Sequence, residues 1–447
     1  MVKFRLLLAT VIVVTIVNHV PAQKVWSLED CIQYALENNI QYKRQKLLAE
    51  TTGNRYLNSK LSLLPTVNGF ANASQNWGTT FSFDKLDYVD QENKDGNLGV
   101  ASRVDLFSGL AKVNTIGQYK YNLLANMQDV ERIKNSITLE VVATYLQILL
   151  DKELLKLAEE QLKITQQQVE RTSRLVEVGN EPRGSLLEIQ AQEALEKANV
   201  TAANNNLNIS YLTLTQLLLL DSVGDFEIEV PVQLDMDESM TVRSPGSIYR
   251  ESLGIMPEIK SAEYFLLSEQ KRLAGARGQR YPSLTLQFAE YTRFNDLAIP
   301  PGGEEDYPYI DQLKDFRSRQ FQLSLSVPIF NYWNVNTQIS NAKVSVNDAQ
   351  LLLEQSKLNL RRNIQQAHAN AIAALENYRS NQEAVKSQQE AFDYAEQRFE
   401  VGLLSSVDYN IAKNNLTRSQ SDLLQSKFQY IFRTRILDFY LGNPITL

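Results

Sequence analysis

The feature that most constrains the fold of this chain is a tandem duplication. Val178-Gly179 recurs as Val401-Gly402 at an offset of 223 residues. Further upstream, Leu64-Pro65 matches Tyr281-Pro282 at an offset of 217 residues. The smaller upstream offset predicts a six-residue insertion in the second copy, which we place at residues 300–305 because loops lengthen at little entropic cost. The chain should therefore contain two similar units built from one pattern.

Most of each copy carries a helical pattern. Apolar residues repeat every seven positions, in the same phase in both copies, at Val141, Ile148, Leu155, Leu162, Val169 and Val176 and at Ile364, Ala371, Tyr378, Val385, Phe392 and Phe399. A sustained seven-residue repeat is typical of coiled-coil helices. Residues 112–176 lack proline, which predicts a helix on the order of 100 Å long. Each long helix ends at a glycine, and Pro182 or Ser405 can begin the next one, so each copy should fold back as an αα-hairpin.

Each copy also contains two segments in which apolar and polar residues alternate. The clearest lies in the second copy, where Phe321 and Leu323 alternate with Gln322 and Ser324. We predict strands at about 66–76, 97–107, 283–292 and 319–330. Segments of about ten residues have the length of a tilted membrane-spanning strand. Four strands cannot close a barrel, and lipid tolerates no open sheet edge, so several copies would have to share one barrel.

The first 22 residues have the pattern of a secretory signal peptide. Lys3 and Arg5 precede an apolar run, and Ala22 provides a small residue at the cleavage point. The rest of the chain divides into a first repeat at 23–222, a linker at 223–250, a second repeat at 251–442 and a tail at 443–447. Predicted helices occupy 28–64, 108–178 and 183–221 in the first repeat, and 258–280, 332–401 and 405–441 in the second. The predicted fold class is mainly α with a small β part.

The composition excludes several classes of function. A net charge of −7 offers no basic face for nucleic acid. Cys31 is the one cysteine, and His368 is the one histidine left after signal removal, so a zinc site within one chain is excluded. We expect a buried thiol and an interhelical hydrogen bond at these positions, and neither a metal nor a cofactor. The sequence has no phosphate-binding loop and no nucleophile elbow, so we predict no catalytic residue and no enzyme.

In their order, these features resemble the TolC family of outer-membrane efflux proteins over residues 27–442. The resemblance is carried by the opening helix at Ser27-Leu28-Glu29-Asp30, the duplication, the proline before each strand pair, the strand ends at Leu106-Phe107 and Ile329-Phe330, and the two Val-Gly breaks. It implies a homotrimer that shares a twelve-stranded barrel in the outer-membrane lipid of a Gram-negative bacterium. A helical tunnel would extend into the periplasm, and loops around 79–96 and 295–317 would face outside.

The family resemblance also implies a function and partners. The chain would be a passive exit duct of a tripartite efflux or secretion system. It would bind a periplasmic adaptor (membrane fusion) protein and receive substrate from an inner-membrane pump, which would supply the energy. The sequence leaves open whether the cargo is a drug, a metal or a polypeptide.

Both helix breaks are candidate adaptor contacts on this resemblance. Val401, Gly402 and Leu403 match the Val-Gly-Leu of the family's second tip, and Val178 and Gly179 keep part of that pattern in the first. The alternative interpretation is that both glycines only end helices.

Asp408 is the candidate entrance gate. It matches the first of two acidic residues that narrow the family's periplasmic entrance, whereas Ile411 and Leu404 occupy the positions of the second acid and of a gate arginine. Three copies of Asp408 around one axis would attract cations. The alternative is a carboxylate that is favoured at a helix N-terminus by the macrodipole.

A protein of a different class shares part of the pattern. A secreted structural coiled-coil interaction protein without a pore would also carry seven-residue repeats. It would have no need of a pair of alternating strands in each copy, and this difference favours the channel.

Overall fold

The computed structural model describes residues 25–82, 86–220, 226–231, 243–300, 302–303 and 307–445. The predicted signal peptide lies outside these residues, as do parts of the linker, of the predicted insertion and of the tail. The chain forms two compact units. The first comprises Met1–Ile40, Asn135–Ser244 and Gln366–Leu447, and the second comprises Gln41–Lys134 and Pro245–Gln365. Each unit takes segments from both copies of the duplication, so the boundaries of the repeats are not those of the units.

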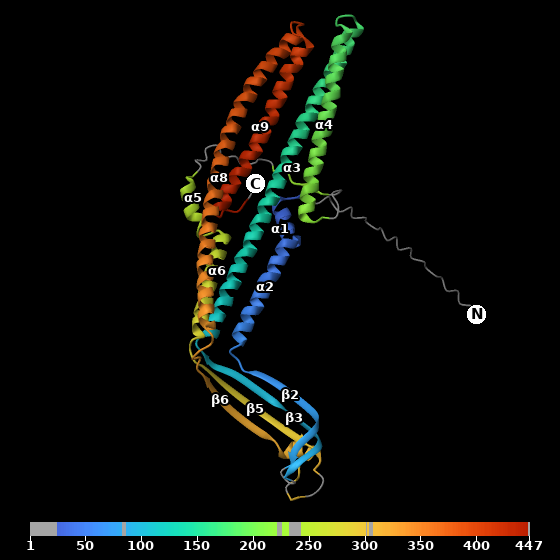
Figure 1. Ribbon diagram of the computed structural model, residues 1–447. Coiled ribbons are helices and arrows are strands. Elements are labelled where there is room, and N and C mark those ends of the chain that lie inside the picture. The colour runs from blue at the N-terminus through green and yellow to red at the C-terminus, as the bar shows by residue number, and fades with distance from the viewer. Residues whose placement is uncertain are drawn as a thin grey trace, which may run out of the picture. The chain divides into compact units, whose positions relative to one another are not determined.

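The second unit contains a four-stranded antiparallel sheet (Figure 1). Its strands are β2 (Thr66–Ser82), β3 (Asp87–Ser108), β5 (Ser283–Asn295) and β6 (Ser318–Ser326), in the order β2-β3-β5-β6. Each copy contributes one hairpin, and the two hairpins join through β3 and β5. The predicted class, mainly helical with a small β part, is confirmed.

The strand register places apolar and polar side chains on opposite faces of this sheet. Leu286 pairs with Leu323 and Phe288 with Phe321, and side chains of directly paired residues share a face. The apolar face comprises Val67, Gly69, Ala71, Leu98, Val100, Val104, Leu286, Phe288, Phe321, Leu323 and Leu325. The opposite face carries Asn68, Asn72, Arg103, Gln287, Gln320, Gln322 and Ser324. In the described chain the apolar face is uncovered, with Phe321 75% exposed.

The bounds of β2, β3 and β6 differ from prediction. The first hairpin continues to Ser82 and Asp87, well beyond the predicted 66–76 and 97–107, so much of the expected loop at 79–96 is strand. Its outer part is mostly polar, and Trp77, Phe81 and Tyr88 are too widely spaced to give the regular alternation that marks a strand. Conversely, β6 ends at Ser326 rather than at residue 330, because Pro328 has no N–H to donate to the ladder.

Two glycines allow the strand-to-helix junctions of the two copies to touch. Gly109 has a φ of +60°, and a Cβ atom there would lie 2.0 Å from the carbonyl oxygen of Gly278. A Cβ atom on Gly278 would lie 2.4 Å from the carbonyl oxygen of Gly109. A side chain would clash at either position. The two glycines therefore let the two backbone segments lie in direct contact at the junction between the sheet and the helices of the second unit.

Most of the chain is helical. The long helices α3 (Ala111–Glu177) and α8 (Asn334–Glu400) fold back at their ends into α4 (Arg183–Leu218) and α9 (Ser406–Tyr440) (Figure 1). Shorter helices are α1 (Leu28–Asn38), α2 (Ile40–Leu61), α5 (Pro245–Ser252), α6 (Pro257–Gly278) and α7 (Tyr309–Asp315). Within the described residues, no helix is both long and apolar enough to cross a bilayer.

Several further elements correct the sequence prediction. The helix predicted at 28–64 is two helices, because Asn39 leaves helical geometry with a ψ of 125°. An asparagine side chain can hydrogen-bond nearby backbone groups in non-helical conformations, and asparagine is therefore favoured where a helix ends. Helices α5 and α7 lie in segments expected to be linker and loop. A short parallel pairing of β1 (Val25–Trp26) with β4 (Glu227–Ile228) was not predicted.

The core of the first unit follows the seven-residue repeat. Val141 and Ile148 on α3 are fully buried, as is Ala371 on α8. The Tyr145 hydroxyl donates a hydrogen bond of 2.7 Å to the carbonyl oxygen of Glu229, which ties α3 to the segment after β4. Cys31 is a buried free thiol, as expected. His368 is half-buried on α8.

Candidate functional site

Each hairpin tip is a helix C-cap whose backbone geometry favours glycine. Gly179 has a φ of +79° and Gly402 a φ of +74°. Beyond them, Asn180 N–H donates to the carbonyl oxygen of Leu175 and Leu403 N–H to that of Arg398, each at 2.8 Å. This is the Schellman arrangement, in which a left-handed residue ends the helix. The two copies therefore end their long helices in the same way.

Local backbone geometry explains the two glycines, but it does not explain the apolar residues beside them. Val178, Val401 and Leu403 are 68–70% exposed. Ending a helix requires no large apolar side chain beside the glycine. These apolar side chains are therefore accessible to another protein at both tips.

Asp408 lies in the cap that begins α9. The Ser405 hydroxyl accepts a hydrogen bond from Asp408 N–H at 3.1 Å and donates one to Asp408 Oδ2 at 2.8 Å. The carboxylate therefore stands in the first turn, where the macrodipole favours it. The helix cap alone is a sufficient reason for an aspartate at position 408. A gating role for Asp408 stays a prediction.

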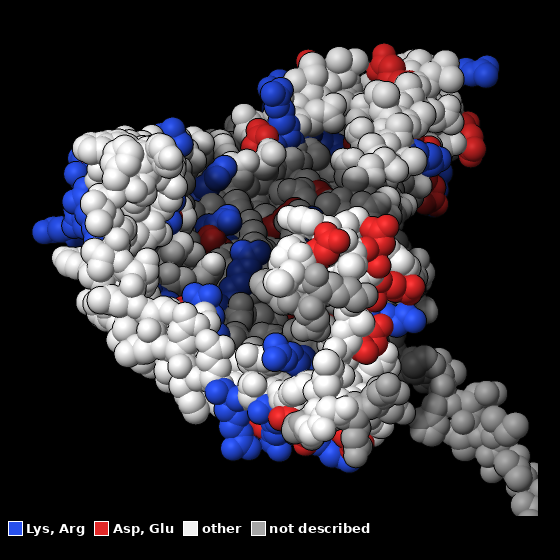
Figure 2. Space-filling model, turned by 60° about the horizontal axis from the view of Figure 1, so that its bottom comes forward, with Lys and Arg blue, Asp and Glu red and all other residues white. Residues whose placement is uncertain are grey.

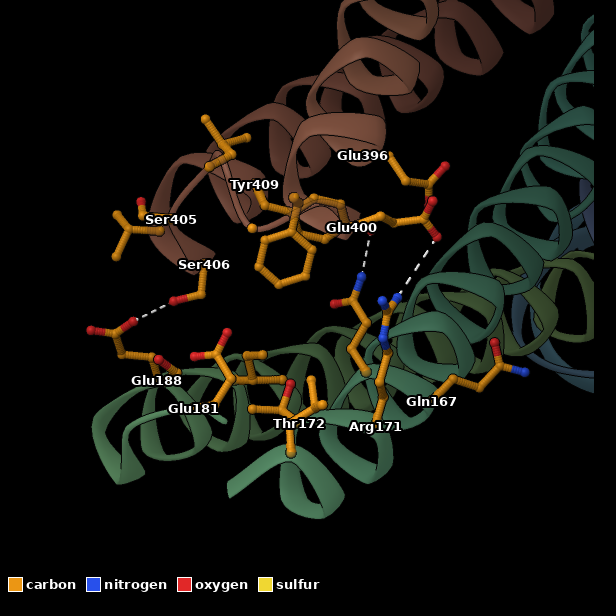
Figure 3. A pocket seen from close by; sticks show the side chains of 18 of the residues that line it. Gln167, Arg171, Thr172, Glu181, Glu188, Glu396, Glu400, Ser405, Ser406 and Tyr409 are labelled. Carbon is orange, nitrogen blue, oxygen red and sulfur yellow. Dashed lines mark hydrogen bonds and ion pairs between the residues drawn. The ribbon is translucent and has the colours of Figure 1, made fainter. Parts of the chain in front are cut away.

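A cavity of about 500 Å³ separates the two hairpin tips within the first unit (Figure 3). It is lined by residues of α3, α4, α8 and α9 and of the turns between them. Arg171 on α3 forms an ion pair of 3.7 Å with Glu400 on α8. The Ser406 hydroxyl donates a hydrogen bond of 2.6 Å to Glu188 on α4. We call this cavity the tip groove, and these two contacts bridge it from hairpin to hairpin.

The tip groove is acidic. Four glutamates line it, namely Glu181, Glu188, Glu396 and Glu400, against one described basic residue, Arg171. Burial raises the pKa of the Glu396 carboxyl, and the neighbouring carboxylates of Glu400 and Asp393 raise it further. A site lined this way attracts cationic groups.

An aromatic cluster forms one wall of the tip groove. The ring of Tyr409 stacks on Phe399 at 4.7 Å and lies 5.5 Å from Phe392. Its hydroxyl accepts a hydrogen bond from the Gln168 amide on α3. Burial raises the pKa of Tyr409 to about 12, so the phenol keeps its proton at physiological pH.

A buried lysine joins the two hairpins below the tip groove. Lys413 on α9 is 2% exposed, and its ammonium donates to the carbonyl oxygen of Gln161 at 3.1 Å and to Thr165 Oγ1 at 2.5 Å. Glu196 on α4 lies 3.6 Å away and is itself buried. Burial lowers the pKa of Lys413, and the carboxylate of Glu196 opposes that shift.

The sequence prediction captured only part of this region. Of the predicted site residues, Gly402 lines the tip groove, whereas Val178, Val401 and Leu403 stand at the exposed tips. Lys413 and Glu196 were missed. A signal was present, because Glu196 follows the buried Ile189 by seven residues and so falls on the apolar stripe of its helix.

Known proteins resemble this chain over most of its length. The toluene efflux pump outer membrane protein TtgC of Pseudomonas putida is 22% identical over 408 residues, which cover 91% of this chain and 80% of that protein. The solvent efflux pump outer membrane protein SrpC of Pseudomonas putida is 23% identical over 413 residues, 89% of this chain and 81% of that protein.

Solved structures share the fold at low sequence identity. A membrane protein from Pseudomonas aeruginosa matches with a TM-score of 0.79 at 17% identity, over 93% of this chain and 90% of that one. The outer membrane protein VceC of Vibrio cholerae matches with a TM-score of 0.76 at 16% identity, over 94% and 97%.

The family assignment follows from a match to both copies of the duplication. The sequence model for outer membrane efflux proteins matches residues 31–218 and 248–443, one segment for each copy. Together these segments cover well over half of the chain. The resemblance to the TolC family of outer-membrane efflux proteins is therefore confirmed, and this chain belongs to the outer membrane efflux protein family.

Proposed function

We propose that three copies of this chain form one passive duct, each adding its four strands to a shared barrel. The chain is an outer-membrane efflux channel protein, and its helices extend into the periplasm. The observation that carries the three-copy proposal is the sheet itself. In the described chain, the outer edges of β2 and β6 have no partner strand, and one face is apolar and uncovered.

Physical chemistry favours closure between copies. Each unpaired backbone group in lipid costs several kcal/mol, so a sheet with two free edges cannot remain open there. If β6 of one copy pairs with β2 of the next, both edges disappear. Three copies then give twelve strands, within the range of known barrels. The apolar face would meet lipid, and the face with Gln320 and Gln322 would line the lumen.

The duct can be tested with purified protein extracted from membranes. We expect a complex that migrates as a trimer without heating and as a monomer after boiling. Inserted into a planar bilayer, it should give discrete single-channel currents. A monomeric protein that gives no current would contradict the proposal and favour the structural coiled-coil protein.

We further propose that the two tips contact a periplasmic adaptor, which would connect the duct to an inner-membrane pump. The exposed Val401 and Leu403 beside the acidic tip groove support this assignment. A photo-crosslinking amino acid at Leu403 should give a product that contains the adaptor, identified by mass spectrometry. The same substitution at Val230, an equally apolar exposed residue away from the tips, is the control. Equal products from both positions would contradict tip docking.

Asp408 remains our candidate for the entrance gate, and the cap geometry shows how to test it. Asp408→Asn keeps a hydrogen-bond acceptor for the cap but removes the charge. Ser405→Ala removes the cap hydrogen bond but keeps the charge. If three Asp408 carboxylates face the pore, the first change lowers cation selectivity in single-channel recordings and the second does not. Unchanged selectivity in Asp408→Asn would remove this residue from the gate.

A further inference from the structure

On strands β5 and β6, the apolar face of the sheet ends in a cluster of two arginines and one glutamate. On β5 and β6, the last apolar pair of this face is Phe288 with Phe321, whose rings lie 4.8 Å apart. The next pair on the same face is Glu290 with Arg319. Glu290 forms ion pairs with Arg319, at 3.3 Å, and with Arg317. We call Glu290, Arg317 and Arg319 the arginine cluster.

The arginine cluster carries a surplus positive charge that faces outward. Its two guanidinium groups are matched by one carboxylate, and their side chains are 60% and 63% exposed, against 27% for Glu290. A guanidinium has five N–H donors, so one shared carboxylate leaves several of them unused. The planar fork of arginine matches the oxygens of a phosphate group. In the view of Figure 2, basic and acidic side chains stand out against a surface that is made largely of uncharged residues.

Aromatic residues indicate the level of the arginine cluster relative to lipid. At the helix end of β6, Phe330, Tyr332 and Trp333 are 67–91% exposed. At the other end, Phe294 on the apolar face packs against Tyr309 of α7, with the ring centres 4.9 Å apart. Aromatic residues at both ends of an apolar band are typical of the two membrane–water interfaces of a strand-built membrane protein. The arginine cluster therefore lies at the interface away from the helices.

We propose that the arginine cluster binds the phosphate groups of lipopolysaccharide in the outer leaflet. This inference rests on the proposed function, since the helices must point to the periplasm for this end of the sheet to face outside. Two observations identify the ligand of the arginine cluster. The cluster is continuous with the lipid-facing surface, which selects a membrane lipid, and its surplus charge selects an anionic headgroup. Lipid A, the membrane anchor of lipopolysaccharide, carries such phosphates at the outer interface.

The test compares two forms of the same lipid. Delipidated trimer is titrated by native mass spectrometry with lipid A that carries its phosphates, and with lipid A from which they have been removed. Wild type should bind the phosphorylated form at least about tenfold more tightly, since charge-assisted hydrogen bonds distinguish the two. The double variant Arg317→Gln/Arg319→Gln should bind both forms alike.

Arg293→Gln is the matched control. Arg293 lies near the same end of β5 but on the opposite, polar face, where its guanidinium stacks on Phe316. This variant should keep the wild-type preference. Equal binding of both lipids by wild type, or a preference kept by the double variant, would overturn the proposal. Single-channel current from the same wild-type preparation separates this failure from failure of the duct itself. Equal binding of both lipids by wild type overturns the proposal even if the double variant does not fold.

Discussion

The buried pair Lys413 and Glu196 gives the most specific prediction about stability. Lys413→Met leaves the Glu196 carboxylate buried with one described hydrogen bond, from the Gln192 amide at 3.0 Å. Removing one partner of a buried ion pair typically costs about 3 kcal/mol. Glu196→Gln should cost less, about 1–2 kcal/mol, because Lys413 keeps the oxygens of Gln161 and Thr165 as acceptors.

The double variant is the critical measurement. Replacing both charges, as in Lys413→Met/Glu196→Leu, removes the desolvation cost as well as the attraction, so its stability should be within about 1 kcal/mol of wild type. Thermal unfolding, followed by circular dichroism at fixed protein and detergent concentration, should show both single variants melting lower and the double variant recovering. Additive losses in the double variant would show that the pair does not act as a unit and would refute the reasoning.

The pH dependence of stability gives an independent check on Lys413. Burial lowers its pKa in the folded protein below the ordinary value of 10.5, so in the window between the two values the unfolded chain binds more protons. The contribution of Lys413 to stability therefore rises as pH increases through that window toward 10.5. Lys413→Met should remove this contribution, and an unchanged alkaline profile would contradict the assignment.

Three further predictions concern backbone and charge. Gly402→Ala should cost about 1 kcal/mol, from the positive φ alone, and speed amide exchange at the tip, whereas Gly402→Asn should cost less. Gly109→Ala should greatly reduce trimer yield on unheated gels, because its Cβ atom would lie 2.0 Å from a carbonyl oxygen. The raised pKa of Glu396 means that folding favours its protonated form, so stability falls as pH rises above 4.5, and Glu396→Gln should flatten that profile in thermal melts.

The sequence predicted those parts of the fold that repeat regularly. The seven-residue spacing of Val141 and Ile148 is a local pattern, and the long helices follow from it. The alternation at Phe321 to Leu325 likewise predicts both the strand and its apolar face. The outer part of the β2–β3 hairpin escaped prediction because it is mostly polar, and its few aromatic residues, Trp77, Phe81 and Tyr88, do not give the regular alternation on which the prediction depends.

Pairings between distant residues could not be predicted from local patterns. The β1–β4 pairing joins Trp26 to Ile228 through only two residues in each strand. The contact of Lys413 with Glu196 depends on how two hairpins align, which no single helix encodes. The tip groove has the same origin, since Arg171 and Glu400 belong to different copies. By contrast, the caps at Gly179 and Gly402 are local and were predicted as helix ends.

Pairing of β2 with β6 between different copies is the central claim, and cysteine crosslinking tests it most directly. In a Cys31→Ala background, single cysteines at Asn68, Phe70 or Asn72 of β2 are combined with Gln322→Cys on β6, all on the polar face. At the correct register, oxidation should yield covalent dimers and trimers on non-reducing gels. If every combination gives only monomer, the strands are not shared between copies and the account fails.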